Sequence, residues 1–387
     1  MYSTLMNEFS FVLPTRIEFG VGAISKLPIE LHTLNVKKPL IITDKGIVKS
    51  GILSKITSLL EKEGFEYVVF DGVDPNPKDF NVENAAKVGI ENNTDSIIAI
   101  GGGSPIDTAK AASALIFYGG DMNDYYGKGK VQGPVHPIIA IPTTAGTGSE
   151  VTFSSVITKS SENFKMTMKS IYIGPKIAIV DPELTITLPP SITASTGVDA
   201  LTHAIEAYSA TCSEPIADAC ALYAIELISG SIREAVNNGS NLEARTAMLM
   251  GSTIAGLAFS HSDVASVHCM AEALGGMYDA PHGVCNSILL PYVMEYSMDY
   301  ATESYARIAK AMGSKEMDSK KAAYEAVEMV KQIVIDINLP KLKDIGIKEE
   351  DIEKLSEMSA ANNSTPSNPR PMGVKEYNEL FKIAFND

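Results

Sequence analysis

The chain is organised around three short sequences: GVDALTHAIE at residues 197–206, VHCM at residues 267–270 and GGMYDAPHG at residues 275–283. Asp199 and His203 are four residues apart, so a helix would place both side chains on one face, about one turn apart. His268 lies in a second apolar segment with a helical pattern. His282 follows a glycine pair and a proline, which predict a break in one helix and the start of another.

Together these side chains predict a metal site. One carboxylate and three imidazoles can hold a divalent cation and leave room for a substrate. Two ordinary explanations stay open: a lone histidine in an apolar segment can be a hydrogen-bonded core residue, and an Asp-x-x-x-His pair can be a local polar contact. The nucleotide-type loops described below favour the metal site, because a nucleotide site and a metal site in one chain indicate chemistry.

Length and charge restrict the classes of protein. A chain of 387 residues exceeds the size at which a single hydrophobic core keeps growing, so two domains are expected. The formal net charge is −15 and no cluster of Lys and Arg occurs, which argues against nucleic acid or an anionic membrane surface as a partner. We also expect no signal peptide and no membrane-spanning segment.

The cysteines indicate the compartment. Cys212, Cys220, Cys269 and Cys285 form no Cys-x-x-Cys pair, so a structural zinc ribbon or a thioredoxin-like site is not expected. Nothing in their spacing demands disulfides, which fits a reducing cytoplasm.

The first half of the chain alternates apolar strands with helices. Apolar runs at residues 39–43, 67–70, 96–100 and 137–141 are separated by helical patterns, of which 51–63 and 79–92 are the clearest. Continuous apolar strands separated by helices predict a parallel sheet covered on both faces. Beyond the proline pair at residues 189–190 strand signals nearly vanish. We therefore expect an α/β nucleotide-binding domain at residues 1–188 and an all-α metal-binding, catalytic domain at residues 189–387.

Two loops at predicted strand ends carry a nucleotide signature. GGGSP at residues 101–105 precedes a helix, whose N-terminus favours a diphosphate, and PTTAGTGSE at residues 142–150 offers small hydroxyl side chains. Asp44 follows the first strand of the sheet and can accept a hydrogen bond from a ribose 2′-hydroxyl. A carboxylate there would repel a 2′-phosphate, which favours NAD over NADP. A glycine-rich turn can also be only a tight turn, and the glycines here do not follow the usual dinucleotide fingerprint.

Over essentially its whole length the chain resembles the iron-containing (group III) alcohol dehydrogenases. The matching stretches are residues 11–22, 101–110, 142–150, 181–188, 197–208 and 267–291. The resemblance implies an N-terminal α/β nucleotide domain, an all-helical C-terminal domain and a cleft between them.

The resemblance also implies roles for individual residues. The implied metal ligands are Asp199, His203, His268 and His282, of which His268 and His282 are also expected to be catalytic. The implied cofactor contacts are Asp44, Asn76, Gly102, Gly103, Ser104, Asp107, Thr143, Thr144, Thr147, Ser149, Lys165 and Leu184.

Two positions depart from the family pattern. Members commonly carry a further histidine four residues after the third ligand, where this chain has Glu272. The helix before that ligand also differs, with His261 in the sequence SHSD at residues 260–263. The ordinary explanation is neutral drift on a cleft wall. The alternative is that both residues shape a substrate pocket for a polar or charged short aldehyde.

These features predict reversible hydride transfer between NAD(H) and a short primary alcohol or diol and its aldehyde. A polar or anionic substrate, such as sulfoacetaldehyde and isethionate or a hydroxy acid semialdehyde, fits the departures. Fe²⁺ is the metal implied by the resemblance, and Zn²⁺ or another divalent metal suits the same ligands. The metal would act as a Lewis acid for the substrate oxygen.

Two other functions stay open. A metal-dependent lyase or synthase could use NAD transiently, as in the related dehydroquinate synthase fold, and a non-catalytic protein could bind a nucleotide beside a structural metal. The family resemblance further implies a homodimer or a larger homo-oligomer.

Overall fold

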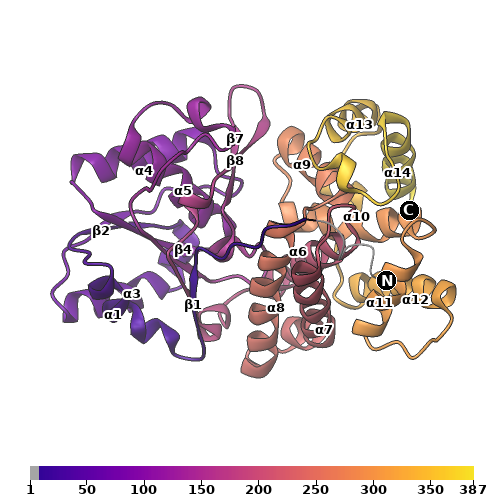
Figure 1. Cartoon of the computed structure of the whole chain (residues 1–387), viewed down its shortest axis with the longest axis horizontal. Coiled ribbons are helices and arrows are strands. Elements are labelled where there is room, and N and C mark those ends of the chain that lie inside the picture. The colour runs from indigo at the N-terminus through magenta and orange to yellow at the C-terminus, as the bar shows by residue number, and fades with distance from the viewer. Residues whose placement is uncertain (1–7) are drawn as a thin grey trace. The chain divides into compact units, whose positions relative to one another are not determined.

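A computed structural model describes residues 8–387 of the chain, which form two compact units. The sheet unit comprises Leu13–Thr144 and Gly148–Thr187. The helical unit comprises Leu188–Asp387, residues 145–147 and the described residues up to Val12. The two units are drawn together in Figure 1 and are described here one at a time. The assignment of residues 1–188 and 189–387 as functional domains stays a prediction, because the compact units exchange short segments.

A six-stranded parallel sheet forms the centre of the sheet unit, with the strand order β1-β9-β6-β4-β2-β3. Its strands are β1 (Arg16–Phe19), β2 (Pro39–Ile42), β3 (Val68–Phe70), β4 (Ser96–Gly101), β6 (Ile138–Pro142) and β9 (Ile177–Val180). The predicted apolar runs thus form strands, and the predicted parallel sheet is confirmed.

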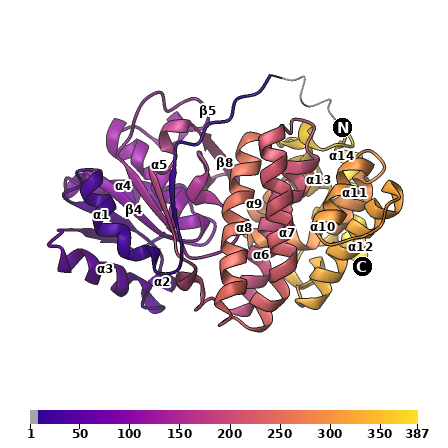
Figure 2. The same cartoon turned by 60° about the horizontal axis from the view of Figure 1, so that its bottom comes forward.

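Helices cover both faces of this sheet. They are α1 (Leu27–Thr33), α2 (Lys45–Lys49), α3 (Ile52–Lys62), α4 (Asp79–Glu91) and α5 (Gly103–Tyr118). Alternate strand residues face opposite sides: Leu40 packs in one apolar cluster with residues of α4 and α5, and Ile41 packs in another with residues of α1 and α3. Figures 1 and 2 show α4 and α5 on one side of the strands and α1 and α3 on the other. This double cover explains the continuous apolar runs in the sequence.

A smaller sheet in the same unit was not predicted. Strands β7 (Ser154–Lys159) and β8 (Phe164–Lys169) form an antiparallel hairpin, and β5 (Gly127–Lys128) pairs with β8 in parallel.

The helical unit contains nine α-helices among the residues described. They are α6 (Pro190–Ser209), α7 (Pro215–Asn237), α8 (Leu242–His261), α9 (Ser266–Tyr278), α10 (His282–Ser297), α11 (Thr302–Ala311), α12 (Ser319–Asp336), α13 (Ile352–Ala360) and α14 (Val374–Asn386). Helix α6 packs against α7, α8 and α10, and α10 packs against α9. The predicted all-α second half is confirmed.

One prediction about these helices is wrong. The glycine pair Gly275 and Gly276 does not break a helix, because both residues are buried inside α9. The helix ends only at Tyr278, and Asp279 follows it in the left-handed conformation with φ of 52°. Helix α10 then begins at His282, as expected. A buried glycine inside a helix indicates close packing rather than an end.

The expectation of no membrane-spanning segment stays a prediction. Helix α7 is long and apolar enough to cross a membrane by length and composition alone. It packs against α6 and α8 and buries residues such as Ile225 and Ile228.

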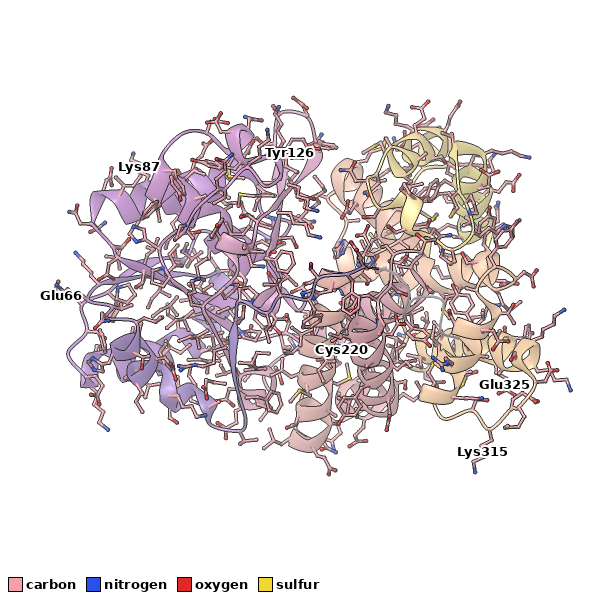
Figure 3. The ribbon with its side chains drawn as sticks, in the orientation of Figure 1. Glu66, Lys87, Tyr126, Cys220, Lys315 and Glu325 are labelled. Atoms are coloured by element: carbon pink, nitrogen blue, oxygen red, sulfur yellow. The ribbon has the colours of Figure 1, made fainter. Side chains whose placement is uncertain are left out.

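Charged side chains such as Glu66 and Lys315 are exposed and point away from the ribbon (Figure 3).

Candidate metal centre and nucleotide-binding loops

Three predicted metal ligands from three helices converge in the helical unit. Asp199 lies in the middle of α6, His268 in the first turn of α9, and His282 is the first residue of α10. One ligand atom from each lies within 4.8 Å of the others. Asp199 and His268 are buried, and the side chain of His282 keeps 32% of its surface exposed. The group therefore has an accessible side, as a site that admits a substrate requires.

The side-chain amide of Asn286 shows how the three ligand atoms are directed. Its Nδ2 donates to Oδ1 of Asp199 at 2.6 Å and lies 3.1 Å from Nε2 of both His268 and His282. One amide nitrogen, with two hydrogens, thus lies within hydrogen-bond distance of one atom from each ligand. The same three lone pairs can bind a divalent cation, so the donor set fits a metal of the Fe²⁺ or Zn²⁺ type.

His203 is close to this group but outside it. Its ring centroid lies 4.4 Å from that of His268, and the ring also stacks on Phe259 at 4.3 Å. Nδ1 of His203 is buried and has no hydrogen-bond partner among the residues described. Burial, and then the neighbouring His268, hold the pKa of His203 well below 6.5. A neutral imidazole with a buried, unpartnered nitrogen is compatible with the predicted role of a fourth ligand.

Glu206 is a part of the site that the sequence analysis missed. Its Oε2 lies 2.5 Å from Nδ1 of His268, and the residue is 3% exposed. Burial alone would lower the pKa of His268, but this hydrogen bond and the charges of Glu206, Asp199 and Glu272 raise it above 6.5. The signal in the sequence is its spacing, because Glu206 lies three residues after His203 on the same helix face.

In the sheet unit the predicted nucleotide loops lie at the carboxyl ends of β4 and β6, and Asp44 follows the neighbouring β2. Gly101 has φ of 146°, and a β-carbon there would lie 2.6 Å from Cγ of Pro105 and 3.3 Å from Oδ2 of Asp44. The connections leave β2 and β4 in opposite directions across the sheet, toward β3 and β6. Such a switch point is where open α/β sheets bind nucleotides.

The first loop leads into the N-terminus of α5. Gly102 is the N-cap residue, and Gly103 and Ser104 begin the helix, so their backbone N–H groups can face an anion. A β-carbon on Gly102 would lie 3.1 Å from Oγ1 of Thr144, which places the two predicted loops in contact. Thr143 donates its backbone N–H to the carbonyl of Gly101 at 2.9 Å, and its buried hydroxyl has no partner among the described residues.

A buried network holds α5 to the second loop. Ser149 donates to Asp107 at 2.5 Å, and the other oxygen of Asp107 accepts from the backbone of Val156 at 2.9 Å. Beneath them Lys110 is fully buried and donates to Ser149 at 2.7 Å and to Thr152 at 2.9 Å. Asp107 and Ser149, predicted as cofactor contacts, therefore also fix the shape of the loop. The sequence analysis did not single out Lys110.

The remaining predicted cofactor contacts are dispersed. Lys165 on β8 donates to Oδ1 of Asn76 at 3.1 Å, so these two lie together. Leu184 is buried in the 3-10 helix Pro182–Thr185. Thr147 belongs to the short segment counted with the helical unit. Asp44 caps α2 by accepting the backbone N–H of Ile47 at 3.0 Å.

The two residues that depart from the family pattern have partners of their own. The ring of His261 stacks on Phe11 at 3.9 Å, and its nitrogens lie 2.8 Å from the carbonyl of Leu257 and 2.9 Å from that of Val12. Glu272 accepts a hydrogen bond from Asn362 at 2.7 Å. Their predicted role in substrate choice stays a prediction.

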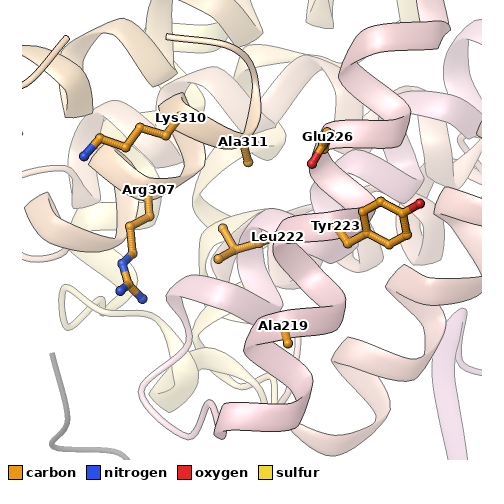
Figure 4. Close-up of a pocket in the computed structure, with 7 residues that line it drawn as sticks. All are labelled: Ala219, Leu222, Tyr223, Glu226, Arg307, Lys310 and Ala311. Atoms are coloured by element: carbon orange, nitrogen blue, oxygen red, sulfur yellow. The ribbon is translucent and has the colours of Figure 1, made fainter. Parts of the chain in front are cut away.

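A surface pocket of about 470 Å³ lies apart from all these residues. It is formed by α7 and α11 and lined by Ala219, Leu222, Tyr223, Glu226, Arg307, Lys310 and Ala311 (Figure 4). None of the predicted site residues lines it, so it is not the candidate active site.

Comparison with known proteins shows the family to which the chain is similar. Residues 14–182 match a family model described as "Iron-containing alcohol dehydrogenase", and residues 193–385 match "Fe-containing alcohol dehydrogenase family, C-terminal". A 1,3-propanediol dehydrogenase of Citrobacter freundii is 41% identical over 382 residues, which cover 97% of this chain and 99% of that protein.

Solved structures are also similar. A 1,3-propanediol oxidoreductase is 40% identical with a TM-score of 0.95, and the match covers 98% of this chain and 100% of that one. A sulfoacetaldehyde reductase of Bifidobacterium kashiwanohense, solved in complex with NAD⁺, is 31% identical with a TM-score of 0.88 and covers 98% and 100%.

Proposed function

The chain belongs to the iron-containing alcohol dehydrogenase family, and from this premise we propose that it interconverts a short primary alcohol or diol and its aldehyde with NAD(H). As a member of the family it is an NAD-dependent, metal-containing alcohol dehydrogenase. The observation that carries the proposal is the convergence of Asp199, His268 and His282 in a chain of this family.

The side chains that would hold the metal are Asp199, His268 and His282, with His203 beside them. When bound, a divalent cation supplies Lewis-acid chemistry at the oxygen of the alcohol or aldehyde. His268 and His282 act in catalysis through this metal, as ligands that fix its place. Glu206 lies 2.5 Å from Nδ1 of His268, and Asn286 lies 3.1 Å from Nε2 of the same ring.

The sheet unit would hold the cofactor. The backbone of Gly102, Gly103 and Ser104 at the start of α5 suits the diphosphate. Asp44 suits the ribose hydroxyls and disfavours a 2′-phosphate. The cofactor carries the hydride, and the protein binds and orients it. Cofactor contacts by Asn76, Asp107, Thr143, Thr144, Thr147, Ser149, Lys165 and Leu184 belong to this proposal.

A neutral hydroxylated substrate is our first choice. The 1,3-propanediol dehydrogenase is 41% identical to this chain, and the side chains of Asp263 and Glu272 in the helical unit are acidic. Glu272 is near enough to His268 for its charge to raise the pKa of that imidazole, so the same charge disfavours an anionic substrate at the metal site. The second candidate is an anionic aldehyde such as sulfoacetaldehyde or a hydroxy acid semialdehyde, supported by the similarity to the sulfoacetaldehyde reductase.

The proposal also covers the location of the enzyme and its oligomeric state. We infer a cytoplasmic location, because none of the four cysteines is in a disulfide. We also infer a homodimer or a larger homo-oligomer from the family, which sedimentation of the purified protein can test.

The test is NADH oxidation by protein loaded with Fe²⁺ in the absence of oxygen. The panel should contain neutral hydroxyaldehydes, simple aldehydes and anionic aldehydes. The proposal expects turnover that is lost on chelation and restored by Fe²⁺ or Zn²⁺. It also expects one NADH formed for each alcohol oxidised in the reverse direction. Product formed without net change in NADH would instead support a lyase or synthase that uses NAD transiently.

No turnover anywhere on the panel, in protein shown to hold metal and NAD, would support the non-catalytic alternative. Replacing His268 or His282 with alanine should abolish metal retention and turnover together. Replacing the exposed His32, whose ring centroid lies 4.9 Å from that of Phe65, is the matched control.

A further inference from the structure

We propose that Glu206 is a positioning residue of the metal centre. Its carboxylate fixes the orientation and the tautomer of His268 so that Nε2 presents a lone pair to the metal. The inference rests on the proposed metal site but not on the identity of the substrate. Glu206 is not one of the predicted metal ligands, and it contacts His268 at Nδ1.

The two carboxylate oxygens of Glu206 accept three hydrogen bonds. Oε1 accepts from the backbone N–H of Val267 at 2.7 Å. Oε2 accepts from the backbone N–H of Ala265 at 2.9 Å and lies 2.5 Å from Nδ1 of His268. The residue is 3% exposed, so water does not compete for these contacts.

These contacts determine which nitrogen of His268 carries a proton. Both carboxylate oxygens of Glu206 act as acceptors toward backbone N–H groups, so we assign Nδ1 of His268 as the donor in this pair. In a neutral imidazole the other nitrogen, Nε2, then has the lone pair. Nε2 indeed faces a donor, Nδ2 of Asn286, at 3.1 Å. Metal-binding histidines are commonly oriented in this way, by a carboxylate on the remote nitrogen.

The same carboxylate caps helix α9. Ala265 is the N-cap residue of α9 and has no side chain that could accept the first N–H groups. Glu206 reaches from α6 and accepts two of them, those of Ala265 and Val267. His268 follows in the same turn, so one side chain fixes both the helix end and the ring. Asp199 lies seven residues before Glu206, or about two turns along the same face of α6.

A purely structural role makes a different prediction from a positioning role. A cap alone contributes to stability, typically about 0.5–2 kcal/mol, and a cap remote from the metal site should leave the metal affinity unchanged. Glu214 provides a matched control, because it is 4% exposed and caps α7 with bonds to Ile216 at 2.9 Å and Ala217 at 2.7 Å. Among the described residues, no histidine forms a hydrogen bond with Glu214.

The experiment measures the affinity of metal-depleted protein for Co²⁺ and Zn²⁺, by the Co²⁺ absorption bands and by competition with a chelator. We expect Glu206→Gln to weaken binding about tenfold and Glu206→Ala about a hundredfold, the range typical of such outer partners. Gln keeps an acceptor but loses the charge, which accounts for the smaller effect. Glu214→Gln and Glu214→Ala should lower the unfolding temperature and leave the affinity unchanged.

Wild-type affinity in Glu206→Gln and Glu206→Ala would overturn the inference, and so would an equal loss in the Glu214 variants. Circular dichroism of the metal-depleted variants establishes that each is folded, and Glu206→Gln, the milder change, keeps the test decisive if Glu206→Ala does not fold. A failure of the proposed function would give a different experimental result from a failure of this inference. In that case wild-type protein would bind metal tightly, with the affinity depending on Glu206, but would oxidise no alcohol.

Discussion

The carbonyl oxygen of Ser195 lies 2.7 Å from the point at which a β-carbon on Gly283 would stand, and the carbonyl carbon lies 3.0 Å from it. Helix α10 therefore begins directly against the backbone of α6. A backbone carbonyl cannot rotate aside as the end of a flexible side chain can. His282 precedes Gly283 in the chain, and Asp199 is one turn beyond Ser195 in α6. The absence of a side chain at Gly283 is what lets these two ligands approach.

Gly283→Ala should therefore push α10 away from α6. We expect a loss of about 1–3 kcal/mol in the free energy of unfolding, as for other overpacked sites, together with weaker metal binding. Gly230 in α7 is the control, because a β-carbon there meets nothing within 4 Å. Gly230→Ala should stabilise the protein by about 0.5–1 kcal/mol. Urea unfolding and metal titration measure both effects, and unchanged metal affinity in Gly283→Ala would refute the packing argument.

Asp44 provides a test of cofactor choice. Asp44→Ser keeps a good N-cap for α2 but removes the charge that would repel a 2′-phosphate. We expect the ratio of kcat/KM for NADPH over NADH to rise at least about tenfold, which corresponds to about 1.4 kcal/mol. Asp121→Ser, at another N-cap of the sheet unit, is the control and should leave the ratio unchanged. No change in Asp44→Ser would place the ribose elsewhere.

Lys110 should make stability depend on pH. Burial lowers its pKa from 10.5 to about 8, although the charges of Asp107 and Glu150 act in the opposite direction. Between these two values the unfolded chain binds more protons than the folded one, so this residue makes stability rise with pH. The rise is on the order of 3 kcal/mol at most, since one pKa unit corresponds to about 1.4 kcal/mol.

Lys110→Met should lack this rise and be less stable at every pH, because it leaves the hydroxyls of Ser149 and Thr152 without their donor. Urea unfolding at about pH 7 and about pH 10 compares the two proteins across the titration. The gap between wild type and variant should widen at the higher pH. Parallel curves would mean that Lys110 does not titrate in this range.

Glu272 and His261 should influence substrate choice. Glu272→Gln keeps the contact available to Asn362 but removes a negative charge, so activity with anionic aldehydes should rise about tenfold relative to neutral ones, equivalent to about 1.4 kcal/mol. His261→Ala should also change this ranking. Glu226→Gln, on the exposed side of α7, should not. An unchanged ranking in both variants would leave neutral drift as the explanation.

The sequence predicts the parts of the fold that local patterns determine. The strands at residues 39–42, 96–101 and 138–142 are continuous apolar runs because the sheet is covered on both faces. The hairpin of β7 and β8 has no such continuous buried run: both strands mix buried residues with partly buried ones, and their partner β5 has only two residues. Such pairing depends on tertiary contacts that the pattern does not contain.

In the candidate site too, the sequence predicts what local spacing determines and misses what helix packing determines. The spacing of Asp199 and His203 predicts their common helix, and both lie on α6. The contact between Glu206 and His268 joins residues 62 positions apart, and it depends on how α9 packs on α6. The glycine pair of α9 predicts a break for a related reason, since the packing that lets the helix continue through these buried glycines has no local signal in the sequence.

The most direct test of the account is the position of the metal. Crystals of protein loaded with Fe²⁺ without oxygen should be measured at the iron absorption edge. We expect one anomalous peak, about 2.1 Å from Nε2 of His268 and of His282 and at a similar distance from a carboxylate oxygen of Asp199, with a nitrogen of His203 also bound. An active protein whose iron lies away from Asp199, His268 and His282 would contradict it.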